Sequence, residues 1–266
     1  MKGVRLGAKI LRTLIKDRMQ YPDRLIADTF AIVARCGILL LLYWYVFNLN
    51  GGTVNGIPYA IAAWSMFLYF AFSTLRLRDL SSEIMRDVQS GNVEVLLSKP
   101  VSYIAYRMWW QIGAGLYPFI VISITASIAL AFIIGIPETM SIGLFVPTLI
   151  VTMLAAALLS LIIYTIVGLL AFWIEEIKPV FWMVDKAVMI MGGSYLPVAL
   201  FPPLLYKLAV YSPFGASQFM THTVYASWQT QWPTLIGFQL AWIVILGLVM
   251  IVMFTRARHK VSVNGG

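Results

Sequence analysis

Acidic residues and histidines are too scattered in this sequence to form a recognisable catalytic or metal-binding motif. The chain holds 11 Asp and Glu and 2 His in 266 residues. His222 and His259 are far apart, and there is no H-E-x-x-H pair. The phosphate-binding pattern G-x-x-x-x-G-K-[ST] is also missing, so this chain is not predicted to hydrolyse ATP by itself. We therefore expect no catalytic residue, no metal site and no cofactor on it.

Three charged residues, Arg35, Asp185 and Lys186, lie within or beside apolar runs. Ionisable residues at membrane depth are costly and therefore functional candidates. Arg35 is expected to pair with Asp28, or to extend to the inner headgroups. Asp185 and Lys186 are consecutive and point about 100° apart on a helix, so they cannot face each other. If their span begins as late as Val184, they lie at its cytoplasmic edge, the interpretation that we favour over a place in the pathway.

Composition indicates a membrane protein, because a mean hydropathy of +0.85 with 61% hydrophobic and 11% charged residues is far too apolar for a soluble domain. A net charge of +8 would suggest nucleic acid binding in a soluble protein, but in a membrane protein the placement of Lys and Arg matters more. No nucleic acid partner is expected. Cys36, the single cysteine, excludes an intramolecular disulfide.

Apolar runs of about 20 residues, the length needed to cross roughly 30 Å of hydrocarbon, predict an all-α integral membrane protein with six spans. The predicted spans are Leu25–Phe47, Ile57–Leu75, Met108–Gly135, Ser141–Ile174, Pro179–Leu200 and Pro233–Thr255. Most Lys and Arg residues then fall on one side, which predicts cytoplasmic N- and C-termini in a plasma membrane. The single spanning domain is 23–256, followed by a cytoplasmic tail, 257–266.

Residues 1–22 form a predicted amphipathic helix that lies on the membrane surface and contacts anionic lipids. In an α-helix, where consecutive residues lie 100° apart, five basic residues fall on one face: Lys2, Arg5, Lys9, Arg12 and Lys16. Ile10, Leu11, Leu14 and Ile15 fall on the other face. Tyr21-Pro22 ends this helix before the first span.

Residues 79–100, between the second and third spans, predict two short helices that form a rigid cytoplasmic elbow. Leu80, Ile84 and Val88 recur at every fourth residue, and Ser90-Gly91 supplies a helix stop. Asn92 is expected to cap the second helix, in which Glu94 favours the positive N-terminal dipole. A loop that only joins two spans would need no such pattern.

The segment RDVQSGNVEVLLSKPVSY, the six spans and the Gly/Pro-rich segment GGSYLPVALFPPLLYKLAVYSPF resemble a type-2 ABC exporter permease, close to a poorly characterised bacterial branch. The resemblance implies half of a transport pathway in a bacterial inner membrane. A second permease copy or a similar permease completes the pathway, and two copies of a separate ABC ATPase subunit hold ATP and Mg²⁺. The cargo is not specified by the fold.

In that family the loop between spans two and three is a coupling helix that sits in a cleft of the ATPase. The resemblance implies that its contacts here are Arg86, Asp87, Ser90, Gly91, Asn92 and Glu94. Glu175, Glu176 and Lys178 of the next cytoplasmic loop are a second candidate contact. Residues 197–232 are implied to form short re-entrant helices that cap the outer end of the pathway. The candidate outer gate comprises Gly192, Gly193, Pro197, Pro202 and Pro203.

Two other classes of protein fit the same composition. One is a membrane-embedded transferase that modifies lipid, with Glu175, Glu176 and Asp185 as polar groups, although no acidic metal motif supports it. The other is a noncatalytic scaffold or channel subunit, which the elbow disfavours. Only the permease requires a soluble ATPase partner, so copurification of such a partner distinguishes the three.

Overall fold

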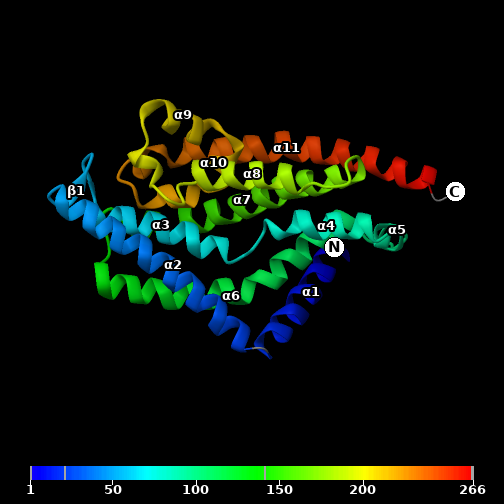
Figure 1. Cartoon of the computed structure of the whole chain (residues 1–266), viewed down its shortest axis with the longest axis horizontal. Coiled ribbons are helices and arrows are strands. Elements are labelled where there is room, and N and C mark those ends of the chain that lie inside the picture. Colours follow the sequence, from blue (N-terminus) through cyan, green and yellow to red (C-terminus); the bar gives the residue numbers. More distant parts are fainter. Residues whose placement is uncertain (1, 21, 141, 265–266) are drawn as a thin grey trace.

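The computed structural model describes residues 2–20, 22–140 and 142–264, and these are almost entirely helical (Figure 1). Within this described part of the chain, four helices contain stretches long and apolar enough to cross a membrane. They are α2 (Pro22–Leu49), α6 (Tyr103–Ile134), α7 (Ile142–Leu169) and α11 (Trp228–Asn264). The apolar stretch in α2 begins at Leu25, as predicted. The prediction of an all-α membrane protein is confirmed.

The second and fifth predicted spans correspond to shorter helices. Helix α3 (Tyr59–Ser73) has 15 residues and is about 22 Å long, and α8 (Lys178–Met191) has 14. The prediction that the fifth span continues to about Leu200 is wrong, because Gly193 adopts φ +78° and the chain turns directly after α8. The count of six spans stays a prediction.

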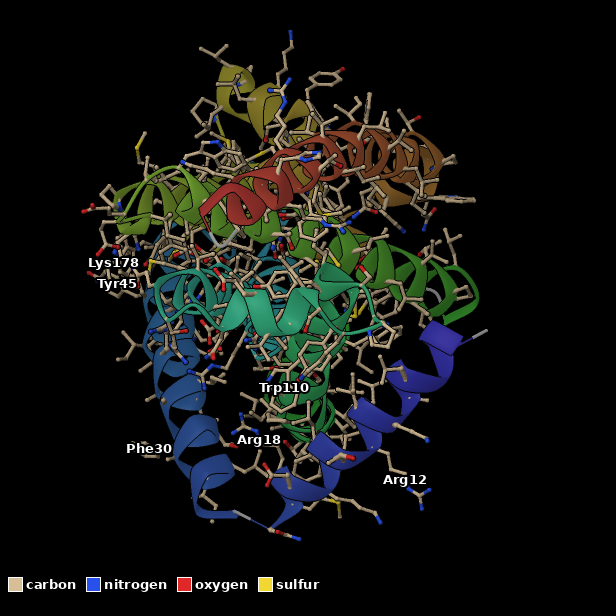
Figure 2. The ribbon with its side chains drawn as sticks, turned by 90° about the vertical axis from the view of Figure 1, so that its right-hand side faces the viewer. Arg12, Arg18, Phe30, Tyr45, Trp110 and Lys178 are labelled. Atoms are coloured by element: carbon tan, nitrogen blue, oxygen red, sulfur yellow. The ribbon has the colours of Figure 1, made fainter. Side chains whose placement is uncertain are left out.

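Helix α7 lies at the centre of the helical assembly. In the most apolar 18-residue stretch of α7, 56% of the residues are buried. The corresponding share is 0% for α2 and 11% for α6 and α11, so these three helices leave much more apolar surface uncovered. Figure 2 shows Phe30 and Tyr45 of α2 pointing outward, and both side chains are more than half exposed. An outward apolar surface on these helices is what contact with lipid or another membrane subunit requires.

The segment between α8 and α11 is folded as four short helices. They are η2 (Val198–Leu200), α9 (Pro203–Tyr211), α10 (Pro213–Ala216) and η3 (Phe219–Val224). Residues 215–225 are all buried, in part against α3 and α7. Irregular backbone at membrane depth is tolerated where protein encloses it, which fits the predicted re-entrant geometry. Its place at the outer surface stays a prediction.

Two predicted boundaries differ from the structure. Helix α11 begins at Trp228, inside the predicted outer segment 197–232. It then continues through Asn264, across the predicted boundary at 257, and the cytoplasmic position of the tail stays a prediction. A short hairpin of β1 (Thr53–Val54) and β2 (Ile57–Pro58) lies at the end of the molecule opposite the elbow, while both chain ends lie on the elbow's side (Figure 1).

The N-terminal helix α1 (Lys2–Met19) is amphipathic, as predicted. Leu14 is buried against α6, where a Cβ added at Gly113 would lie 2.8 Å from its Cδ1. Lys9, Arg12 and Lys16 are exposed, and Figure 2 shows Arg12 pointing away from the rest of the chain. The side chains at positions 2 and 5, and that of Tyr21, lie outside the described residues. The apolar face of α1 therefore packs on a neighbouring helix.

Candidate functional site: the α4–α5 elbow

The predicted elbow is present as helix α4 (Asp79–Gln89) and helix α5 (Asn92–Leu97). Gly91 between them has φ +75°, a left-handed conformation that favours glycine, as the helix stop predicted. The prediction that Asn92 caps α5 is wrong, because Gly91 occupies the cap position and no side-chain cap forms. Glu94 lies in the first turn of α5, as expected for a favourable dipole interaction.

Helix α4 packs its apolar face onto α7. Leu80 and Ile84 are fully buried, and a Cβ added at Gly168 of α7 would lie 2.8 Å from the Cβ of Ile84. A glycine at this point therefore allows the two helices to approach closely. The elbow is thus part of the folded core, and does not hang from the membrane domain as a loose loop.

The C-terminal end of α4 is tied to α6 through Asp87. The Asp87 carboxylate accepts hydrogen bonds from Tyr103 Oη at 2.7 Å and from Arg107 Nε at 2.6 Å, and Arg107 Nη2 contacts its other oxygen. Only 5% of the Asp87 side chain is exposed. The prediction of an ATPase contact at Asp87 is therefore corrected, because an internal clamp occupies its carboxylate.

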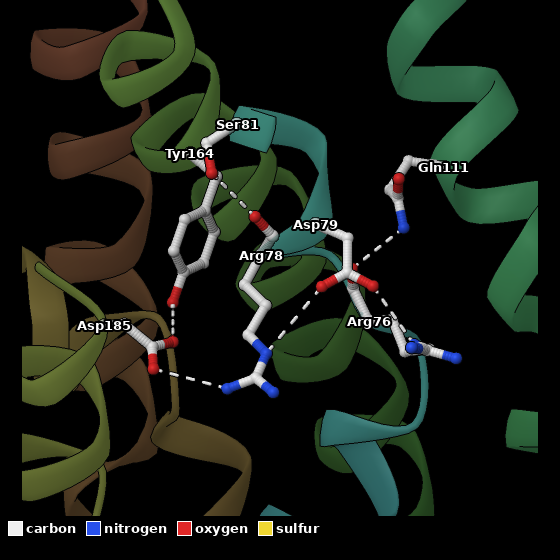
Figure 3. A network of polar contacts seen from close by, with 7 residues as sticks. All are labelled: Arg76, Arg78, Asp79, Ser81, Gln111, Tyr164 and Asp185. Atoms are coloured by element: carbon white, nitrogen blue, oxygen red, sulfur yellow. Dashed lines mark hydrogen bonds and ion pairs between the residues drawn. The ribbon is translucent and has the colours of Figure 1, made fainter. Parts of the chain in front are cut away.

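The N-terminal end of α4 is tied to α7 and α8 through Asp185 (Figure 3). Arg78, directly before α4, donates from Nη1 to Asp185 Oδ2 at 3.3 Å, and Tyr164 Oη of α7 donates to Asp185 Oδ1 at 3.1 Å. Asp185 is 2% exposed. It lies in the middle of α8, and its place at the cytoplasmic edge of the span or in the pathway stays a prediction.

The two other charged candidates near apolar runs are placed differently. Lys186 is exposed and lies over the ring of Trp182 at 5.4 Å, so Asp185 and Lys186 do point apart as predicted. Arg35 is exposed on α2 and lines a cavity beside Asp185. Its predicted pairing with Asp28 lies outside the described side chains.

The connection between α3 and α4 is held against α6. Gln111 of α6 donates from Nε2 to the Arg76 carbonyl at 2.8 Å (Figure 3), and Ser81 Oγ donates to the Arg78 carbonyl at 2.9 Å. A Cβ at Gly115 would lie 2.3 Å from the Leu75 carbonyl oxygen, so only glycine permits this approach. Both ends and one face of α4 are therefore fixed to membrane helices.

The face of the elbow that does not pack on the membrane helices is polar and solvent-accessible. The predicted contact residues exposed there are Arg86, Ser90, Gly91, Asn92 and Glu94. Arg86 forms an ion pair with Glu83 at 3.2 Å, and Ser90 Oγ donates to the Arg86 carbonyl at 2.7 Å. These bonds stiffen the helix and leave the charged groups accessible.

The second predicted contact loop lies next to the elbow. Gln89, the last residue of α4, donates from Nε2 to the Glu175 carbonyl at 2.8 Å. Glu175, Glu176 and Lys178 are all exposed. A hydrogen bond from Lys178 lowers the pKa of the Glu176 carboxyl below its usual value. The fold therefore combines the elbow and this loop into one charged surface.

The candidate gate residues are distributed along the α8–α9 connection. Gly192 and Gly193 are buried, and a Cβ at Gly192 would lie 2.5 Å from Cγ of Gln218. Pro197 is buried too, whereas Pro202 and Pro203 are exposed at the start of α9. The tight glycines allow the chain to turn back against α8. Their role as a gate stays a prediction.

The residues that fix the elbow were missed by sequence reasoning. Arg78 and Arg107 counted only among the basic residues of a cytoplasmic loop. Tyr103 was only the end of the cytoplasmic motif, and Tyr164 and Gln111 were only parts of predicted spans. Their partners are 16 to 107 positions away in the sequence. No local pattern in the sequence marks pairs at such separations. For Asp87 there was one weak signal, because this acidic residue lies next to an apolar position of an amphipathic helix.

These features define a multi-pass α-helical membrane protein with a short helical elbow bonded to three of its helices. A family model described as "ABC-2 family transporter protein" matches residues 35–265. The chain therefore belongs to the ABC-2 transporter family, and is a membrane permease component of an ABC transporter. The resemblance drawn from its motifs is confirmed. No curated protein matches the sequence.

Proposed function

We propose that this chain is the transmembrane subunit of an ATP-driven exporter, and that the α4–α5 elbow docks on a separate ABC ATPase. The observation that carries the proposal is the attachment of both ends of α4, through Asp87 to α6 and through Arg78 and Asp185 to α8. A docking helix held in this way cannot move without moving those helices, because each bond joins it to a different one. This is what coupling of ATP hydrolysis to transport requires.

The exposed charges of the elbow and the adjacent loop suit a partner surface. Arg86 and Glu94 present charges of opposite sign, and Glu175 and Glu176 add acidic groups beside them. Exposed charge pairs steer association and fix register without the cost of burying an unpaired ion. ATP and Mg²⁺ belong to the ATPase, and this chain needs no cofactor of its own.

The complete exporter contains two permease chains and two ATPase subunits, in a bacterial inner membrane with both termini of this chain in the cytoplasm. Support comes from the family, from the predominance of basic residues in the predicted cytoplasmic segments, and from the two chain ends lying on the elbow's side (Figure 1). The short helices after α8 close the outer end of the pathway.

The experiment is affinity purification of the full chain from membranes of its own cells, with identification of bound proteins by mass spectrometry and assay of ATP hydrolysis. We expect an ABC ATPase with the wild-type chain, and loss of at least about 1.4 kcal/mol of binding, tenfold in affinity, with Glu94→Lys. Glu138→Lys is the matched control, because Glu138 is also exposed and follows α6, at the opposite end from the elbow.

Asp87 is left out of this test because its replacement disturbs the internal clamp. An ATPase retained equally by both variants would reject docking at the elbow. Lipid-modifying activity without any ATPase would instead support the transferase, and neither activity would support a scaffold.

A further inference from the structure

A cavity of about 110 Å³ lies between α2, α3, α7 and α8, beside the Arg78–Asp185 pair. Arg35 of α2 and the segment Arg76–Arg78 form its exposed side. Asp185, Ser160 of α7 and Gln218 of the re-entrant segment close its buried side. The cavity therefore has a basic, open entrance, and on its buried side these polar groups lie among apolar side chains such as Phe70 and Val188.

Arg35 is the most unusual member of the entrance. It sits ten residues into the apolar stretch Leu25–Leu49, about 15 Å along the helix. The ion pairs among the described side chains do not include Arg35, and its predicted partner Asp28 lies outside those side chains. A guanidinium at this depth is costly unless an anion or water accompanies it. Arg78, in contrast, already shares its charge with Asp185 and Asp79.

The buried side of the cavity carries two polar atoms without hydrogen-bond partners. Ser160 Oγ and Gln218 Oε1 are both unpartnered, and their residues are 2% and 5% exposed. Leaving such groups unsatisfied costs free energy, and both belong to residues that line the cavity, so a hydrogen bond to a guest there would offset that cost. The Ser160 hydroxyl can donate to an anion, and the Gln218 oxygen can accept from a water or from a protonated oxyanion.

We propose that this cavity binds a phosphate-type oxyanion, with Arg35 as its main charge partner and Ser160 as a neutral donor. A guanidinium presents paired N–H groups that match the oxygens of phosphate, and 110 Å³ holds several waters or one tetrahedral group. The phosphate is either free or the headgroup of a membrane lipid. The proposal does not depend on the ATPase, because only residues of this chain form the site.

The test uses the purified full chain in an uncharged detergent. Its melting temperature is followed during titration with inorganic phosphate in one arm and with phosphatidylglycerol in the other, because a ligand that binds only the folded chain raises it. Native mass spectrometry counts bound lipid. We expect Arg35→Gln to weaken the binding of whichever ligand binds by about tenfold. Arg35→Lys should weaken it less, because lysine keeps the positive charge but lacks the paired N–H groups of the guanidinium.

The charge-matched control is Arg258→Gln, at an exposed position on α11, which should change affinity less than about twofold. Without ligand, Arg35→Gln should melt no lower than wild type, because it removes an exposed charge that has no ion-pair partner among the described side chains. If only phosphatidylglycerol binds and its binding depends on Arg35, the ligand is a lipid headgroup. If the binding of inorganic phosphate depends on Arg35, the ligand is soluble. Binding unaffected by Arg35→Gln, or weakened equally by Arg258→Gln, would overturn the proposal.

Discussion

Arg107 at the start of α6 donates from Nε to Asp87 of α4 across 2.6 Å, so the last turn of the elbow and the first turns of a membrane helix are joined by a largely buried ion pair. Tyr103 completes the clamp at 2.7 Å. Since Asp87 lies one residue from exposed Arg86, the same short helix presents one charge to solvent and uses the next to bind α6.

The Asp87 clamp predicts a large loss of stability for Asp87→Asn. Removing one member of a buried ion pair leaves Arg107 with only the more distant carboxylate of Glu83, at 3.9 Å, and we expect a cost of about 3 kcal/mol. Thermal unfolding of the purified chain measures it. Glu94→Gln, an exposed site nearby, should cost less than about 0.5 kcal/mol. Equal melting temperatures for wild type and Asp87→Asn would show that the clamp contributes nothing.

The close approach of α6 to the α3–α4 connection predicts that Gly115→Ala is destabilising. Its Cβ would lie 2.3 Å from the Leu75 carbonyl oxygen, and displacing that backbone should cost about 1–3 kcal/mol. Gly237→Ala in α11 is the control, because nothing lies within 4 Å of its added Cβ and alanine favours a helix. If both variants unfold at the wild-type temperature, the contact is not as tight as the structure has it.

The burial of His222 predicts that the chain loses stability in acid. This histidine lies in η3, between the fifth and sixth predicted spans. Burial lowers its pKa from 6.5 to about 4, so the folded chain keeps it neutral. As pH falls through 6.5, only the unfolded state gains this proton, and the folded state loses about 2 kcal/mol by pH 5.

Melting temperatures measured from pH 7.5 to pH 5 test this. His222→Gln should remove that part of the acid sensitivity, while His259→Gln, near the C-terminal end of α11, should retain it. Identical pH profiles for wild type and His222→Gln would contradict a neutral buried histidine.

The arrangement of the chain predicts which positions are reachable from outside the cell. Asn55, in the hairpin turn, and Ser90, in the elbow, lie at opposite ends of the molecule (Figure 1). In a Cys36→Ser background, Asn55→Cys should react with an impermeant thiol reagent in intact cells, and Ser90→Cys only after permeabilisation. Reaction of Ser90→Cys in intact cells would invert the proposed topology.

The sequence by itself determined the membrane class, the amphipathic N-terminal helix, the two-helix elbow and its left-handed stop at Gly91. Each of these depends on composition or on periodicity within a few residues, and such local preferences persist in the folded chain. The family resemblance was likewise carried by contiguous motifs.

Only the tertiary structure decided which charges of the elbow face inward. Asp87 and Glu94 look alike in the sequence, yet Asp87 is buried by Tyr103 and Arg107 whereas Glu94 remains exposed. Asp185 likewise became buried in the middle of α8 because Arg78, 107 residues away, reaches it. Such pairs form because a charge enters a low-dielectric interior only with a partner, and which partner is near depends on how whole helices pack.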